Sequence, residues 1–367
     1  MFDKLPIKGR HKYKYKEMIN DKITKQEGGE NSTNLQGQSI VINQGITYQD
    51  AKNIAIDVFK SNYLELSAKA ADTARQRAEE LVDDFLTEVK ERNPNSLNAM
   101  EDPGMQYAIF TAQKEYAKTG DKDLSDMLVD ILVDRAAQAE RNLKQIVLDE
   151  SLSIVPKLTL SQLDTLTIIF ILKYSRNHNV GNLVQLKKYL EHYILPFTQL
   201  LSKEQSLYQH LEFAGCGSIS LGSSQIESTL LMTYKGLFCK GFTKEQIENI
   251  AIPFENLQSI IVPCLQDLTK LQLAVIDEDI LDQKAATIGL GVDQINLLKP
   301  FLNNYQMNAE EAKTFLKQQG DFMNILFDVW DNSPLQNMTL TSVGIAVATA
   351  NLRRKTGISV DLGIWIK

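Results

Sequence analysis

The sequence predicts a mainly α-helical protein built from several segments, and three observations lead to that expectation. Apolar residues recur every three or four positions through most of the 367-residue chain. Glycine, proline and short polar runs interrupt this periodicity at intervals typical of helix ends. Stretches with strand character are short, near residues 39–43, 218–221 and 360–366. We therefore expect a long N-terminal helix region and a helical C-terminal domain with a small β element.

Composition places the chain among soluble globular proteins, with 43% hydrophobic and 23% charged residues. The formal net charge of -7 gives no overall attraction to nucleic acid. Three cysteines, Cys216, Cys239 and Cys264, are too far apart in sequence for a CxxC metal site or a disulfide framework. The N-terminus lacks the apolar segment of a signal peptide, and no apolar run reaches the ~18 residues of a membrane helix. We expect a cytoplasmic protein without membrane contact.

Residues 1–46 are predicted to form a polar arm. Residues 1–27 contain eight Lys and Arg against four Asp and Glu, which is typical of a solvated arm or of a weak phosphate contact. Residues 28–45 combine Gly, Asn, Gln and Ser with one β-branched run, so stacked copies could form amide ladders. The alternative is a linker with one strand on its own domain. The residues assigned to assembly are Asn34, Gln36, Ile40, Ile42 and Gln44.

Residues 47–155 are predicted to be the long-helix region. Thr47 is a candidate N-cap with Asp50 at the N3 position, and one or two helices fill the chain up to Asn93. An apolar, Ala-rich stripe along this segment suits close helix packing, either within the chain or between chains. Further helices are expected over residues 105–118 and 124–152, separated by Gly120 as a C-cap.

Residues 156–367 are predicted to form the C-terminal domain. Residues 163–174 are apolar on nearly all sides, which is typical of a buried central helix. The tail, residues 360–366, has the period of a half-buried strand and is expected to pair with residues 40–43 or 218–221. Residues 340–341 are a further strand candidate. The other expected helices are 183–201 with a break at Pro196, 203–213, 225–238, 244–250, 267–276, 294–303, 309–319, 322–330 and 342–356.

No motif of a known chemistry is complete, so no catalytic residue, cofactor or metal ligand is assigned. Residues 236–243 have the glycine spacing of a phosphate loop, but Phe242 replaces its lysine. His210 and Cys216 could form a thiol-imidazole pair beside a glycine-rich loop at residues 215–222, although a buried structural thiol is the simpler interpretation. The acids of residues 277–282 suit a helix N-terminus better than a divalent ion.

The chain resembles an uncharacterised bacterial protein family of about this length. The resemblance rests on residues 28–34 (GGENSTN), 42–46 (INQGI) and 54–60 (IAIDVFK), and on an ending that reads LTSVG, NLRRKTG and DLGIWI at residues 340–344, 351–357 and 361–366. It implies kinship and no particular activity. The C-terminal half is more loosely similar to Abi-alpha type abortive-infection proteins, which share an LT-x-x-G element near the end. That similarity implies a role in phage defence.

These observations favour a non-enzymatic, self-associating cytoplasmic protein of bacterial anti-phage defence. We expect a homo-oligomer that assembles through residues 28–45 and the helix of residues 51–89. The alternative is a nucleic-acid-binding regulator with a winged-helix-like C-terminal domain, in which Arg353, Arg354 and Lys355 contact phosphate. The competing interpretation of these three cations is that they complement the dipole of a helix C-terminus. Nucleic acid is therefore the less favoured partner.

Overall fold

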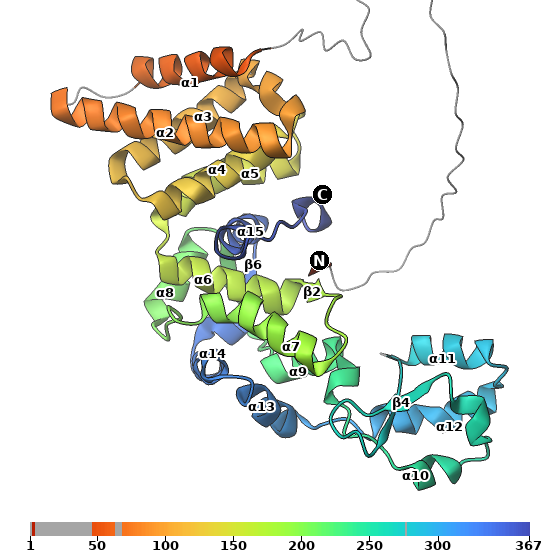
Figure 1. Ribbon diagram of the computed structural model, residues 1–367. Helices are drawn as coiled ribbons and strands as arrows, with labels where there is room; N and C mark the ends of the chain where they lie inside the picture. Colours follow the sequence, from red (N-terminus) through yellow and green to blue (C-terminus); the bar gives the residue numbers. More distant parts are fainter. Residues whose placement is uncertain (1, 4–45, 63–67, 276) are drawn as a thin grey trace, which may run out of the picture.

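The computed structural model describes residues 2–3, 46–62, 68–275 and 277–367. In these residues the protein is mainly α-helical, and its strands are short. Figure 1 shows a stack of helices at one end, a central helical layer, and a small lobe at the other end. Among the helices of the described ranges, none has the length and apolar character that crossing a bilayer requires.

The N-terminal stack is a bundle of helices in which α2 packs against α1, α3 and α4. Its elements are α1 (Tyr48–Asn62), α2 (Ala68–Arg92), η1 (Pro94–Glu101), α3 (Pro103–Thr119), α4 (Lys122–Ala136), α5 (Leu143–Ile154) and η2 (Val155–Lys157). The predicted apolar stripe of α2 is buried in this bundle, including Ala74, Ala78 and Leu81. Since the stripe packs within one chain, assembly through α2 would have to use the polar face of that helix.

The central layer is built around α6, as the apolar run of residues 163–174 predicts. Thr159 and Gln162 form a capping box at its start, and Leu166 to Ile169 are fully buried. The helical elements of this layer are α6 (Leu160–Ile169), η3 (Phe170–Tyr174), α7 (Leu183–Tyr189), η4 (Leu190–Ile194), η5 (Leu195–Phe197), α8 (Gln205–Phe213), α9 (Ile226–Thr233), η6 (Lys235–Phe238), α13 (Ala309–Lys317), α14 (Asp321–Asp331), η8 (Pro334–Asn337), α15 (Ser342–Thr356) and η9 (Leu362–Ile364).

Helix α15 joins the two layers, because it packs against α6 as well as against α4 and α5. One hydrophobic core therefore contains buried residues from Ala51 to Ile366. The predicted regions 47–155 and 156–367 share this core. The C-terminal end of α15, which carries three consecutive cations, lies beside the bundle.

The lobe, residues 240–306, has a hydrophobic core of its own, which includes Phe242, Leu298 and Leu302. Its entry and exit run side by side: the Lys240 N–H donates to the Tyr305 carbonyl at 2.7 Å, and the Met307 N–H donates to the Phe238 carbonyl at 2.8 Å. The lobe is therefore an insertion between α9 and α13. Its elements are α10 (Lys244–Glu248), η7 (Phe254–Leu257), β4 (Ile261–Pro263), β5 (Leu271–Leu273), α11 (Glu278–Thr287) and α12 (Val292–Asn303).

The described strands form antiparallel pairs. β1 (Phe2–Asp3) pairs with β2 (Arg176–Asn177), β3 (Gly217–Ile219) with β6 (Met338–Leu340), and β4 with β5. The strand candidates at 218–221 and 340–341 thus overlap strands that pair with each other. The candidate at 39–43 lies outside the described residues.

The predicted strand at residues 360–366 is wrong, because this segment contains the short helix η9. The Asp361 carboxylate accepts from the Gly363 N–H at 2.8 Å and begins the turn. Leu362 and Ile366, four residues apart, are both buried. Trp365 packs its ring on Phe170 with centroids 4.9 Å apart. Helical spacing, not alternation, therefore decides which side chains of the tail face the core.

Two predicted helices are also corrected. Residues 124–152 form two helices, α4 and α5, because the Asn142 side chain accepts from the Gln145 N–H at 2.8 Å and starts a new helix. Residues 267–276 contain strand β5 and a tight turn in place of a helix. The Asp267 carboxylate accepts from the Thr269 N–H at 3.1 Å and its hydroxyl at 2.6 Å, which fixes the turn between β4 and β5.

Candidate functional site

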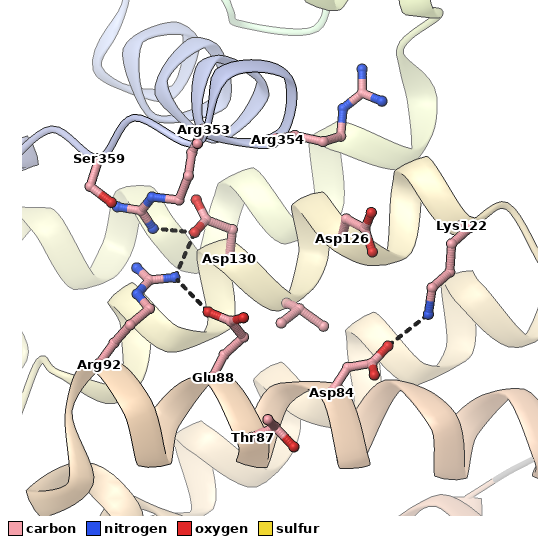
Figure 2. A pocket seen from close by; sticks show the side chains of 12 residues that line it. Asp84, Thr87, Glu88, Arg92, Lys122, Asp126, Asp130, Arg353, Arg354 and Ser359 are labelled. Atoms are coloured by element: carbon pink, nitrogen blue, oxygen red, sulfur yellow. Dashed lines mark hydrogen bonds and ion pairs between the residues drawn. The ribbon is translucent and has the colours of Figure 1, made fainter.

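A cavity of about 580 Å³ lies where α2, α4 and the C-terminal end of α15 meet, and most of its lining is ionisable (Figure 2). We call it the charged cavity. It is lined by Asp84, Thr87, Glu88, Arg92, Lys122, Asp126, Val129, Asp130, Arg353, Arg354, Gly357 and Ser359.

Helix periodicity brings the acids of this cavity together. On α4, Asp123, Asp126, Asp130 and Asp134 are three or four residues apart, which places them along one face of the helix. On α2, Asp84, Glu88 and Arg92 follow the same spacing. Figure 2 shows Asp126 and Asp130 of the α4 row opposite the α2 row, with Arg353 reaching from α15 toward Asp130.

Arg92 holds the rows of α2 and α4 together. Its Nη1 lies 2.7 Å from Asp130 Oδ1 and its Nη2 lies 2.9 Å from Asp134 Oδ1. Arg353 forms a second ion pair with Asp130. Burial raises the pKa of Asp134, and the nearby Asp130 raises it further. The two guanidinium groups therefore offset the repulsion between these carboxylates.

Lys122 and Arg354 are also neutralised by acids. Lys122 Nζ lies 2.7 Å from Asp84 Oδ2 and 2.9 Å from Glu80 Oε1. Burial by itself would lower the pKa of Lys122, but the bonds to Asp84 and Glu80 raise it well above its usual value. Arg354 Nη1 lies 2.7 Å from Asp123 Oδ1. The cations that line the cavity are thus all in ion pairs.

Asp126 differs from the other charged residues of the cavity. Within the described part of the chain, no hydrogen bond or ion pair joins its carboxylate, and Figure 2 draws it without a partner. Burial raises the pKa of Asp126; Lys122 and Arg354 oppose that rise, whereas Asp84 and Asp123 add to it. The Asp126 side chain is largely exposed, and neighbours of both charge signs act on its carboxylate.

The predicted phosphate-contacting residues are all held by carboxylates. Arg353 pairs with Asp130, and Arg354 with Asp123. Lys355 Nζ lies 2.7 Å from Asp164, whose side chain is 1% exposed. A phosphate would have to displace these acids, so this geometry does not favour the nucleic-acid alternative. The predicted assembly residues Asn34, Gln36, Ile40, Ile42 and Gln44 lie outside the described residues.

The other residues considered for chemistry, Cys216, His210 and the acids of residues 277–282, have contacts typical of structural roles. Cys216 is fully buried, and burial raises the pKa of its thiol to about 12. His210 Nδ1 lies 2.8 Å from Gln162 Nε2. In the acidic run at residues 277–282, the Asp277 side chain caps α11 by accepting from the Ile280 N–H at 2.7 Å. In the described ranges, no three His, Cys, Asp or Glu residues are grouped to hold a metal ion.

Sequence reasoning did not single out Asp126. The available signal was the spacing of the acids at 123, 126, 130 and 134, which marks one face of a helix. The cationic partners of the other three acids come from distant segments, so only the fold shows that none of the described cations pairs with Asp126.

Comparison with known proteins gives a family without an assigned activity. The model of an uncharacterised family matches residues 45–366, which is most of the chain. No curated protein and no solved structure matches the chain.

Proposed function

We propose that this chain, which belongs to the uncharacterised family matched over residues 45–366, works by self-association and not by catalysis. The contact that we propose is a cationic side chain of one copy bound in the charged cavity of another. The observation that carries the proposal is Asp126, a carboxylate without a partner among the described residues, in a cavity whose cations are all paired.

The balance of charge around the cavity supports a cationic occupant. The lining has four cations and four acids, and three further acids outside the lining pair with these cations: Glu80, Asp123 and Asp134. Burial raises the pKa of Asp126, and Asp84 and Asp123 add to that rise, so an added ammonium or guanidinium group would stabilise its charged form. Such a charge-assisted bond is stronger than a neutral hydrogen bond.

The N-terminal arm supplies cations of the required kind. Residues 1–27 have eight Lys and Arg against four Asp and Glu, whereas the rest of the chain has 31 against 42. Opposite charge on arm and body favours association between copies and makes it sensitive to salt. The amide-rich residues 28–45, with Asn34, Gln36, Ile40, Ile42 and Gln44, remain a proposed second contact in the same assembly.

The test is the mass of the full chain by light scattering over a range of protein and salt concentrations. We expect a multimer at low salt that dissociates as salt rises. Asp126→Asn should weaken association about tenfold or more, since it removes one charge-assisted bond. Asp293→Asn is the matched control, because it removes an exposed carboxylate of the lobe far from the cavity.

Two results would overturn the proposal. One is a mass of a single chain under all conditions. The other is equal association of Asp126→Asn and Asp293→Asn. Replacing Lys12, Lys14 and Lys16 by Gln tests the other side of the contact, and its effect should not add to that of Asp126→Asn.

We further propose bacterial anti-phage defence as the setting of this assembly. Its support is the resemblance of the C-terminal half to Abi-alpha type proteins. The same two variants test this role. Phages should form fewer plaques on cells that carry the unaltered chain or Asp293→Asn than on cells without the protein. Asp126→Asn should restore the plaque number. Equal plating on all strains would contradict this role.

A further inference from the structure

A second cavity, of about 280 Å³, lies at the junction between the central layer and the lobe. We call it the junction cavity. The β4–β5 hairpin of the lobe forms one side, and β2 with the segment around Tyr234 forms the other. Sites between two structural units are common places for small ligands. The apolar residues of the lining are Val180, Leu237, Val262, Leu265, Leu273 and Val275.

Among the described residues that line the junction cavity, Arg176 alone is charged. Its guanidinium carbon lies 5.9 Å from the ring centroid of Tyr234, and its Nε is buried without an acceptor. Of the acids whose side chains the structure describes, none forms an ion pair with Arg176. This contrasts with Arg92, which contacts three acids. Among the residues whose side chains the structure describes, which leave out Asp3 opposite Arg176 in the β1–β2 pair, the charge of this half-buried guanidinium is unmet. An unmet charge of this kind is costly.

The neighbouring polar groups are already satisfied. Gln272 Nε2 donates to the Gly236 carbonyl at 3.1 Å, and its Oε1 accepts from the Leu265 N–H at 2.9 Å. The Tyr234 hydroxyl bonds to the backbone of Asn177. Within the described part of the chain, the cavity therefore lacks a single anionic group with an apolar body attached.

We propose that the junction cavity binds a small organic monoanion, with its carboxylate on Arg176 and its apolar part against the β4–β5 hairpin. A carboxylate matches the fork of the guanidinium and can accept from Nε. Burying the apolar part of the ligand against the apolar lining removes hydrocarbon surface from water, which favours binding. The volume of about 280 Å³ lies just below the range of drug-sized sites, which favours a small ligand.

Calorimetric titration of the full chain with octanoate tests this proposal. Acetate supplies the charge without the apolar body, and octan-1-ol supplies the body without the charge. We expect octanoate to bind at least about tenfold more tightly than either control. Arg176→Met should weaken octanoate binding by about 10- to 100-fold, which is the usual effect of losing hydrogen bonds to a charged group.

A second variant guards against an effect on folding. Ala274→Phe fills the cavity from the hairpin side and leaves Arg176 in place, so it should also abolish octanoate binding. Without ligand, Arg176→Met should be at least as stable to urea as the unaltered chain, because it removes an unpaired charge. The proposal is overturned if octanoate does not bind, if octan-1-ol binds as tightly, or if both variants bind octanoate normally.

Discussion

At the residue scale, Lys173 shows how a lysine is held without an acid. Its Nζ donates to the carbonyls of Gln336 and Met338 at 2.8 Å and to that of Leu335 at 3.4 Å, and it lies 5.1 Å from the Trp330 ring. Burial lowers the pKa of Lys173 from 10.5 to about 8. One ammonium group thus ties the carbonyls of a short segment, residues 335–338, to η3.

We predict that Lys173 makes stability depend on pH above neutrality. Between about pH 8 and 10.5 the folded chain has lost this proton and the unfolded chain still binds it. The unfolded state then binds more protons, so the unfolding free energy should rise with pH in this interval, by about 2 kcal/mol. Urea titrations from pH 7 to 10 on the unaltered chain and on Lys173→Met measure this contribution as the difference between the two profiles.

Lys173→Met should also destabilise the protein at pH 7 by about 1–3 kcal/mol, because three carbonyls lose their donor. Lys188→Met, on the exposed face of α7, is the matched control and should change stability by less than about 0.5 kcal/mol. Parallel pH profiles for all three chains would contradict this account of Lys173.

At the scale of elements, the structure explains the LT-x-x-G segment physically. The Thr341 hydroxyl caps α15 by accepting from the Gly344 N–H at 3.1 Å, and it donates to the Gly215 carbonyl at 2.6 Å. A Cβ on Gly344 would lie 1.8 Å from the Cys216 carbonyl oxygen. The segment is therefore where β3, β6 and the start of α15 meet, which gives it a structural role.

Gly344→Ala should lower the unfolding free energy by about 3 kcal/mol or more, because the added methyl group meets backbone atoms that cannot turn aside. Gly222→Ala is the matched control, since nothing lies within 4 Å of its Cβ position. Urea midpoints of the two variants measure the difference. Equal midpoints would show that β3 and α15 separate without cost, against the proposed role of Gly344.

Elements with their own local signals were predictable from the sequence. The helix predicted for residues 309–319 is an example, because Asn308 and Glu311 form a capping box at the start of α13. The helix predicted for residues 267–276 is wrong because Leu268 and Leu271 have a helical spacing by chance. Leu268 is 79% exposed, and the turn that begins at Asp267 determines the local backbone geometry. Local periodicity predicts an element only where the apolar residues of that period face a core.

At the scale of the whole molecule, neither candidate site could be predicted, because both depend on pairs far apart in sequence. The run of Arg353, Arg354 and Lys355 looks like a phosphate contact until the fold places Asp130, Asp123 and Asp164 beside it. Asp126 and Arg176 are notable for the opposite reason, since partners do not reach them among the described residues. The residues next to a charged side chain in the sequence do not show whether that side chain finds a partner of opposite charge in the fold.

The separate core of the lobe leads to a prediction about the cooperativity of unfolding. Residues 240–306 leave and rejoin the body at one antiparallel crossing, Cys239 opposite Gln306, and their core includes Leu298 and Leu302. Units with independent cores and a small connection unfold in separate steps. We expect two transitions in scanning calorimetry of the full chain.

Leu298→Ala, in the lobe, should lower only one of these transitions, by about 10 °C or more, because emptying a buried leucine site costs about 2–5 kcal/mol in a unit of this size. Leu166→Ala, in the core of the body, should lower only the other. A single transition that both variants shift would mean that lobe and body unfold as one unit.

Octanoate should raise the temperature of the lobe transition in the unaltered chain and not in Arg176→Met. A ligand at the junction contacts both units and so stabilises their docked arrangement.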